Sequence, residues 1–230
     1  MKIIGLDYSN NSPGLCVSHD FRTFDFVSIT ARHSISKKNE AFLHDATGEI
    51  EGYHCSFVDL NPTRASRHYY ENERLKTLNG VTIKRAISSE ITKSTYGQTR
   101  DTIVAMEGLA MNARGSSLID LCLCTGQVRD TIVADVLGYN IERFFIFTPG
   151  ELKNAIGAKG NCGKEVVFQA FLDDPVIPAV RDGDFYKFLS DNRDHEYVRK
   201  NDKIIHPWDD LLDAYLCVLK IYKTLNPDEQ

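Results

Sequence analysis

Four acidic residues occur where separate segments of the chain could bring them together. Asp7 ends an apolar run that is typical of a buried strand, and Glu107 directly follows the apolar run Thr102–Met106. Asp210 and Asp213 are three residues apart near the start of a predicted helix, so they share one helix face. Clustered carboxylates repel one another unless a cation joins them. Oxygen ligands without clustered Cys or His favour Mg²⁺ or Mn²⁺ over zinc.

Each of these acids also has an ordinary structural interpretation. An acid after a strand is usually a turn residue, and Asp209 and Asp210 in a first helical turn would serve the helix dipole. Asp213 is harder to explain in this way, because it lies in a leucine-rich turn where an unpaired carboxylate is costly. Asp209 is four residues from Asp213, so the sequence leaves open whether Asp209 or Asp210 is the helix ligand.

Basic residues gather in two stretches. The segment Pro62–Arg100 carries eight Lys or Arg against three acids, although the whole chain has a net charge of −5. The segment Lys153–Lys164 holds three lysines and no acid. Most charge runs are solvated faces, but these could follow a phosphate backbone, with Tyr69, Tyr70 and Tyr96 available to stack on bases. The residues predicted to contact DNA are Arg64, Arg67, Arg74, Lys84, Arg85, Lys153, Lys159 and Lys164.

The elements that must position these residues follow a mixed α/β pattern. Three short apolar strands separated by turns predict an antiparallel meander, and two later strands are separated by a helix over 116–137, so they are expected to be parallel. Further helices are predicted over Glu151–Ile156, over Lys164–Phe171 and from Pro207 to about Lys223. The five predicted strands are Lys2–Asp7, Leu15–Ser18, Phe24–Thr30, Thr102–Met106 and Ile141–Phe147.

The remaining segments show weaker patterns. The hydrophobic residues of 31–66 show no clean period, so this segment is predicted to be an insertion or a mobile loop. Residues 66–95 are predicted to be mainly helical, with a break near Asn79-Gly80. Residues 173–203 are polar and are predicted to be loop. We therefore expect one domain over 1–230, a five-stranded mixed sheet flanked by helices, with an insertion at about 31–100 between the third and fourth strands.

Composition excludes several classes of protein. Hydrophobic residues make up 42% of the 230 residues, which is enough for a sizeable core and argues against global disorder. No apolar run approaches the roughly 20 residues that a membrane span needs, and the first residues lack a secretory signal. The six cysteines form no C-x-x-C pair, which suits a reduced compartment. A cytoplasmic protein without membrane contact is expected.

Together these motifs resemble the RuvC-type Holliday-junction resolvases of the RNase H-like superfamily. Ile-Ile-Gly-Leu-Asp7-Tyr-Ser resembles their opening strand, Val-Ala-Met-Glu107-Gly their second acidic motif, and Asp210-Leu-Leu-Asp213-Ala their terminal helix. Thr125-Gly-Gln-Val-Arg-Asp resembles the helix between them, and Pro149, Lys153 and Lys164 resemble their basic loop. The match covers roughly residues 1–30 and 101–223 as spaced motifs. Residues 31–100 depart from the pattern, which affects substrate preference more than chemistry.

The resemblance implies a function and a mechanism. It implies an RNase H-like fold and a homodimer that resolves four-way DNA junctions by paired nicks, with the interface on helix 116–137 or on the insertion. It also implies two Mg²⁺ ions per active site, with Mn²⁺ able to substitute, which activate a water and stabilise the leaving 3′ oxygen. Asp7, Glu107, Asp210 and Asp213 would hold the ions, and Lys153 and Lys164 would neutralise charge on the phosphate or hold the DNA strand.

Other functions remain open from the sequence. A nuclease of the same superfamily that cuts other branched DNA, flaps or RNA–DNA hybrids would have the same metal site. A non-catalytic junction-binding protein is expected to lack one of the four carboxylates, and none is missing from this sequence. An actin-like kinase would need a repeated fold and a second glycine-rich phosphate-binding loop. A proofreading exonuclease would need a D-x-E motif in its first strand, whereas this chain has Asp7-Tyr8-Ser9 there. Ser9 could bond a metal-bound water but is predicted to cap the turn. His206 could orient a ligand or water but is predicted to be structural or solvent-facing.

Overall fold

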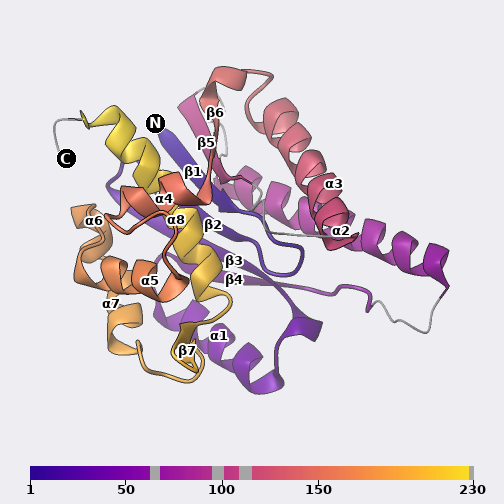
Figure 1. Ribbon diagram of the computed structural model, residues 1–230, viewed down its shortest axis with the longest axis horizontal. Helices are drawn as coiled ribbons and strands as arrows, with labels where there is room; N and C mark the ends of the chain where they lie inside the picture. Colours follow the sequence, from indigo (N-terminus) through magenta and orange to yellow (C-terminus); the bar gives the residue numbers. More distant parts are fainter. Residues whose placement is uncertain (63–67, 95–100, 109–115, 228–230) are drawn as a thin grey trace.

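The computed structural model describes residues 1–62, 68–94, 101–108 and 116–227, with side chains in the last range from residue 120 (Figure 1). A central sheet of six strands has the order β4-β3-β2-β1-β5-β6. The pairs β1–β2 and β2–β3 are antiparallel, whereas β3–β4, β1–β5 and β5–β6 are parallel. The strands are β1 Lys2–Asp7, β2 Gly14–His19, β3 Thr23–Ala31, β4 Tyr53–Val58, β5 Thr102–Glu107 and β6 Phe144–Phe147.

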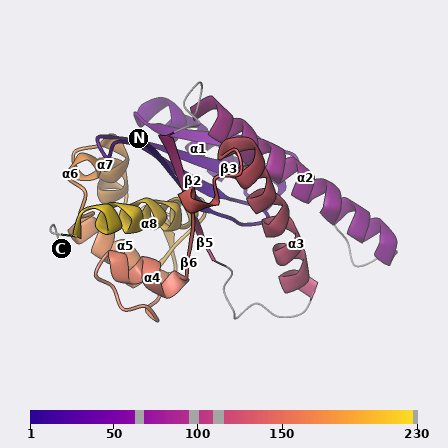
Figure 2. The same cartoon turned by 90° about the horizontal axis from the view of Figure 1, so that it is seen from above.

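Helices cover both faces of this sheet. Figure 2 shows α2 and α3 side by side on one face and α8, α4 and α5 on the other. Adjacent residues of β1 alternate between two cores: Ile3 packs with α8, and Ile4 packs with α2 and α3. The helices are α1 Lys37–Glu49, α2 Tyr69–Ser94, α3 Ser116–Thr131, α4 Pro149–Ala155, α5 Lys164–Asp173, α6 Pro178–Arg181, α7 Asp184–Asp191 and α8 Trp208–Leu225.

The predicted mixed α/β sheet is confirmed, with the antiparallel meander and the two later parallel strands in place. The strand count was wrong by one, because β4 lies within the predicted insertion and adds a sixth strand beside β3. The fifth predicted strand is shorter than expected. Residues Ile141–Arg143 form a 3-10 turn, and β6 begins at Phe144.

Two segments predicted to be loop contain regular structure. Residues 31–66 hold α1 and β4; α1 buries only Leu43 and Ala46, so its apolar stripe is too sparse to show in the sequence. Residues 173–203 hold α6, α7 and the short hairpin of β7 Arg199–Lys200 and β8 Lys203–Ile204. Helix α7 packs through Phe185 and Leu189 into the α8 side of the core.

The predicted break at Asn79-Gly80 was also wrong, because α2 runs through both residues. Gly80 meets the neighbouring helix there: a Cβ on it would lie 2.7 Å from the Cys124 sulfur. The Asn79 amide is held by the backbone of Asn61, which accepts from its Nδ2 at 2.9 Å and donates to its Oδ1 at 2.8 Å. Tertiary contacts therefore account for both residues that resembled a turn.

Helix α8 lies unusually close to the first two strands. A Cβ on Gly5 of β1 would lie 2.0 Å from the Ala214 carbonyl oxygen, and a Cβ on Gly14 of β2 would lie 2.4 Å from the Asp210 carbonyl oxygen. Glycine is the residue that permits such an approach of two backbones. The two glycines thus let α8 bring its acidic N-terminal turns against the end of β1. Among the described residues, no helix has the length and apolar character needed to cross a bilayer.

Candidate active site

Three acids from three elements meet at one edge of the sheet. Strands β1 and β5 are parallel neighbours with Leu6 opposite Met106, so Asp7 and Glu107 leave the sheet side by side. Asp213 reaches them from the second turn of α8. One carboxylate oxygen from each of Asp7, Glu107 and Asp213 lies within 4.8 Å of the other two. The convergence expected from the sequence is therefore present for these three residues.

Asp210 lies beside this group and is held by two neighbours. Its Oδ2 accepts a hydrogen bond from Ser12 Oγ at 2.8 Å and lies 2.6 Å from His206 Nδ1. The residue is 2% exposed, yet it lines the same cavity as Asp7 and Asp213. After burial, the charge of Asp210 is the largest cause of the raised pKa of Asp7.

Asp209 has different partners. Its Oδ2 accepts a hydrogen bond from Lys164 Nζ at 3.0 Å, and its Oδ1 lies 2.9 Å from His206 Nδ1. It does not line the cavity that holds Asp7 and Asp213. The sequence left open which of the two is the helix ligand. The geometry favours Asp210, because Asp209 is paired with Lys164 instead.

Lysines predicted in the basic loop lie at different depths. Lys164, the first residue of α5, places its Nζ 3.1 Å from Asp213 Oδ2 while its side chain stays 46% exposed. Lys153 lies on α4, whose start is capped by Thr148, and its Nζ donates to the Cys162 carbonyl at 2.6 Å. The charge of Lys153 lowers the pKa of Glu107, so it acts on the acidic group from a distance. Lys159 is exposed on the loop between them.

The acids strongly perturb one another's ionisation. Burial, followed by the charges of Asp210, Asp213 and Glu107, raises the pKa of Asp7 well above its usual range. Burial, followed by the charge of Asp213, raises the pKa of Glu107 to about 7. Burial also raises the pKa of Asp210 and of Asp213. A bound cation would relieve this repulsion, so the donor set fits a divalent metal that prefers oxygen.

In the neighbouring ion pairs, the pKa shifts favour the charged form of each residue. Burial would raise the pKa of Asp209, but hydrogen bonds and charges from His206 and Lys164 hold it below its usual range. Hydrogen bonds to Asp209 and Asp210 raise the pKa of His206 to about 10. Burial lowers the pKa of Lys164, but the nearby aspartates raise it above its usual range overall. The centre therefore combines ion pairs, whose pKa shifts favour the charged forms, with four acids whose pKa values are raised.

These acids surround a cavity of about 290 Å³. It opens over the ends of β1 and β5, with α3 on one side and α8 and the start of α5 on the other. Its lining residues include Asp7, Glu107, Asp210, Asp213, Lys164, Tyr8, Ser9, Leu121 and Thr125.

The structure as a whole is similar to two solved structures of RuvC from Thermus thermophilus. The first, a structure of RuvC, has 14% sequence identity and a TM-score of 0.44, and the match covers 99% of this chain and 97% of that one. The second is RuvC in complex with Holliday junction substrate, with 13% identity, a TM-score of 0.47 and coverage of 100% and 97%. No protein-family model and no curated protein sequence matches the chain. Similarity this low carries no functional information, so the chemistry must be inferred from the side chains themselves.

Sequence reasoning missed one residue of the centre and undervalued another. Ser12 lies between the first two predicted strands and was not predicted to contribute, but its hydroxyl donates to Asp210. His206 was predicted to be structural or solvent-facing; its side chain is 57% exposed, and its Nδ1 also contacts both Asp209 and Asp210. Its position three and four residues before these acids, just ahead of the predicted helix, was the available signal. Ser9 accepts a hydrogen bond from the Ser12 backbone N–H at 2.8 Å, so its predicted turn role is confirmed.

The basic stretch 62–100 is only partly free to contact DNA. Lys76 is paired with Glu73 at 2.8 Å and with Asp120 at 2.9 Å, and Lys93 is paired with Glu90 at 2.7 Å. Along α2, Arg74 and Arg85 are exposed, Lys84 is half-buried, and none of the three forms an ion pair with a described residue. Tyr69 and Tyr70 are exposed at the start of α2. The predicted contacts Arg64, Arg67 and Tyr96 lie outside the described residues.

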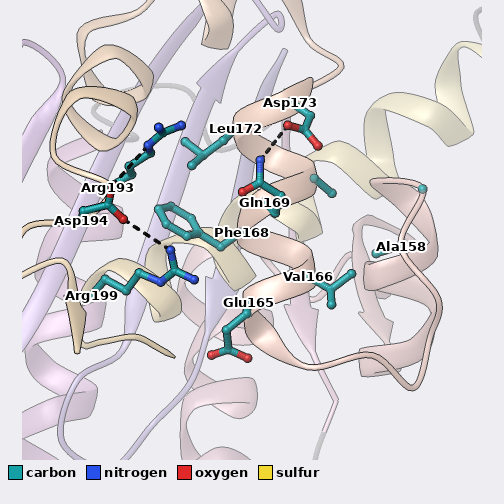
Figure 3. A pocket seen from close by; sticks show the side chains of 12 residues that line it. Ala158, Glu165, Val166, Phe168, Gln169, Leu172, Asp173, Arg193, Asp194 and Arg199 are labelled. Atoms are coloured by element: carbon teal, nitrogen blue, oxygen red, sulfur yellow. Dashed lines mark hydrogen bonds and ion pairs between the residues drawn. The ribbon is translucent and has the colours of Figure 1, made fainter. Parts of the chain in front are cut away.

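A larger cavity, of about 720 Å³, lies along α5 and the segment that contains Arg193 and Arg199 (Figure 3). Both arginines point toward Asp194, at 3.5 Å each, and Glu165 and Asp173 add two further acids to the lining. The cavity has no excess of positive charge and does not include the acidic group. The smaller cavity is therefore the candidate active site.

We expect Mg²⁺ to stabilise the protein more at higher pH. The folded-state pKa of Glu107, about 7, exceeds its usual value of 4.5, so its contribution to metal-free stability is present below about pH 4.5 and is lost as the pH rises through about 7. Because Mg²⁺ binds the ionised acids, Mg²⁺ at about a hundredfold its Kd should raise the melting temperature by about 5–10 °C near pH 7.5. The rise should be much smaller near pH 5. Thermal melts with MgCl₂ or EDTA measure both effects, and an equal rise at both pH values would contradict the prediction.

Proposed function

We propose that the chain is a Mg²⁺-dependent endonuclease that hydrolyses phosphodiester bonds in branched DNA, with four-way junctions as its preferred substrate. The observation that carries the proposal is the meeting of Asp7, Glu107 and Asp213 within 4.8 Å, with the Lys164 ammonium 3.1 Å from Asp213. Clustered carboxylates that hold Mg²⁺ beside a cationic group are suited to phosphoryl transfer, because the attacking water, the phosphate and the leaving oxygen all carry or develop negative charge.

The residues present fit two divalent ions with oxygen ligands. Asp7, Glu107, Asp213 and Asp210 would hold them, because these four carboxylates line one cavity and the pKa of each is raised. When bound, the ions supply an activated water and stabilise the charge that develops on the leaving oxygen. Mn²⁺ has the same preference for oxygen and is expected to substitute.

The protein's own groups position these acids. Ser12 donates to Asp210 Oδ2, and His206 Nδ1 lies between Asp209 and Asp210, so the ligand side of α8 is fixed from two directions. Lys164 lies between Asp209 Oδ2 and Asp213 Oδ2. When Asp213 turns to a metal, Asp209 can keep the ammonium beside the cavity, where it would bind an oxygen of the phosphate.

Binding of branched DNA and dimerisation belong to the same proposal. Arg74, Lys84 and Arg85 on α2 and Lys159 on the basic loop would contact the phosphates of the junction arms, and affinity should then fall steeply with salt. Paired nicks in a two-fold symmetric junction need two active sites, which a homodimer supplies. The exposed side chain of Leu123 on α3 is available for such an interface.

The proposal is tested by cleavage of three substrates built from shared sequences: an immobile four-way junction, a 5′ flap and an RNA–DNA hybrid. Each is incubated with the full chain in Mg²⁺, Mn²⁺ or EDTA, and the products are mapped on denaturing gels. We expect paired, symmetric nicks in the junction that require metal. Faster cutting of the flap or the hybrid would reassign the substrate. Absence of metal-dependent cutting on all three would refute the proposal.

Lys164 and Asp209 should affect cleavage without affecting metal binding. Lys164→Ala removes the cation beside the phosphate and should slow single-turnover cleavage about a hundredfold. Asp209→Asn leaves Lys164 in place but loosely held, and should slow it about tenfold. Both variants should keep the Mg²⁺-induced rise in melting temperature. Lys38→Ala, at an exposed site on α1, is the matched control and should cleave normally. Normal cleavage by Lys164→Ala would make this lysine a surface charge.

A further inference from the structure

The structure assigns a substrate-binding role to Thr125: we propose that its hydroxyl donates a hydrogen bond to a non-bridging oxygen of the phosphate that is cut. The inference rests on the proposed nuclease function and adds a contact from the side of the cavity opposite Lys164. None of the metal ligands or basic residues considered above supplies this contact.

Thr125 has an unusual combination of burial and missing partners. It lies in the middle of α3 and is 1% exposed, yet its Oγ1 has no hydrogen-bond partner among the described residues. A hydroxyl in a helix normally bonds a backbone carbonyl or faces solvent. Leaving a hydroxyl buried and unpaired destabilises the folded protein. Such a cost is typical of a group that is kept for a ligand.

The position of Thr125 shows where that ligand would lie. Thr125 lines the 290 Å³ cavity together with Asp7, Glu107 and Lys164. Helix α3 covers the face of the sheet opposite α8 and α5 (Figure 2). Thr125 on α3 and Lys164 on α5 therefore line the cavity from elements on opposite faces of the sheet. A phosphate between them could be bound from both sides.

The chemistry of the cavity favours a phosphate oxygen as the acceptor. The carboxylates are expected to be occupied by metal, so a neutral hydroxyl can donate to the anionic oxygens that metal and Lys164 leave free. Gly126, the next residue, is exposed, and no atom of a described residue beyond its own helix and chain neighbours lies within 4 Å of where its Cβ would be.

The decisive variant is Thr125→Val, which keeps the shape of the side chain and removes its hydroxyl. A hydrogen bond to a charged group contributes about 1.5–3 kcal/mol, so single-turnover cleavage of the junction should slow about 10- to 100-fold. The metal-free melting temperature should stay the same or rise, because a buried unpaired group is removed. The Mg²⁺-induced stabilisation should persist. Thr125→Ser should restore most of the rate, and Thr131→Val is the matched control on the same helix.

The outcomes separate this inference from the function on which it rests. If the wild type cuts the junction and Thr125→Val cuts equally fast, the inference is wrong and the nuclease function stands. A lower melting temperature for metal-free Thr125→Val, or failure of Thr125→Ser to restore the rate, would show that the residue is structural and would also overturn it. If the wild type cuts none of the three substrates, the function and the inference both fall.

Discussion

Asp7→Asn should abolish metal-dependent cleavage and leave the fold intact. Asp7 ends β1 at the centre of the acidic group, where the charges of Asp210, Asp213 and Glu107 add to burial in raising its pKa. The amide keeps the shape but loses the charge that a divalent ion needs. Loss of several kcal/mol of transition-state stabilisation corresponds to a slowing of at least about a thousandfold in single-turnover cleavage.

Two further measurements distinguish this effect from misfolding. The metal-free melting temperature of Asp7→Asn should equal or exceed that of the wild type, because one of several repelling carboxylates is gone. Its rise with Mg²⁺ should be largely lost, while binding to the junction persists. Asp45→Asn makes the same chemical change at an exposed site on α1 and should behave as the wild type. Rapid cleavage by Asp7→Asn would remove Asp7 from the mechanism.

Gly5→Ala should strongly destabilise the protein although it adds one methyl group. The new Cβ would lie 2.0 Å from the Ala214 carbonyl oxygen and 2.9 Å from Val218 Cγ2, so α8 would have to move away from β1. Overpacking against a backbone atom leaves little room to relax, and we expect a loss of about 3 kcal/mol or more. Urea unfolding measures this loss, and the protein that remains folded should cleave slowly because α8 carries Asp210 and Asp213.

Gly48→Ala provides the matched control for this change. Gly48 lies near the end of α1, and no atom lies within 4 Å of its expected Cβ. Alanine there should be neutral or should stabilise by about 0.5–1 kcal/mol, because glycine is a poor helix former. If Gly5→Ala were as stable as Gly48→Ala, the close approach of α8 to β1 would be incorrect.

The spacing of hydrophobic residues was sufficient to predict the strands and the helix in which those residues recur most regularly. The strands that end on Asp7 and Glu107 were predicted nearly to the residue, and the last helix was placed within two residues of its observed ends. Helix α1 and strand β4 were missed because they bury few side chains and obtain their stability from neighbours distant in sequence. Asn79 and Gly80 were misjudged for the same reason, since their partners are Asn61 and Cys124.

By itself, the sequence determined which residue types could do the chemistry and which strand ends and helix turn carry them. Only the tertiary structure decided how Asp209 and Asp210 divide their roles and that Ser12 and His206 support them. It also showed that Thr125 lines the cavity and has a buried, unpaired hydroxyl. The physical reason is the separation in sequence between the residues that interact. Strand and helix periods are set by neighbours a few residues apart, whereas these contacts join residues up to 198 positions apart and depend on how closely α8 packs against two glycines.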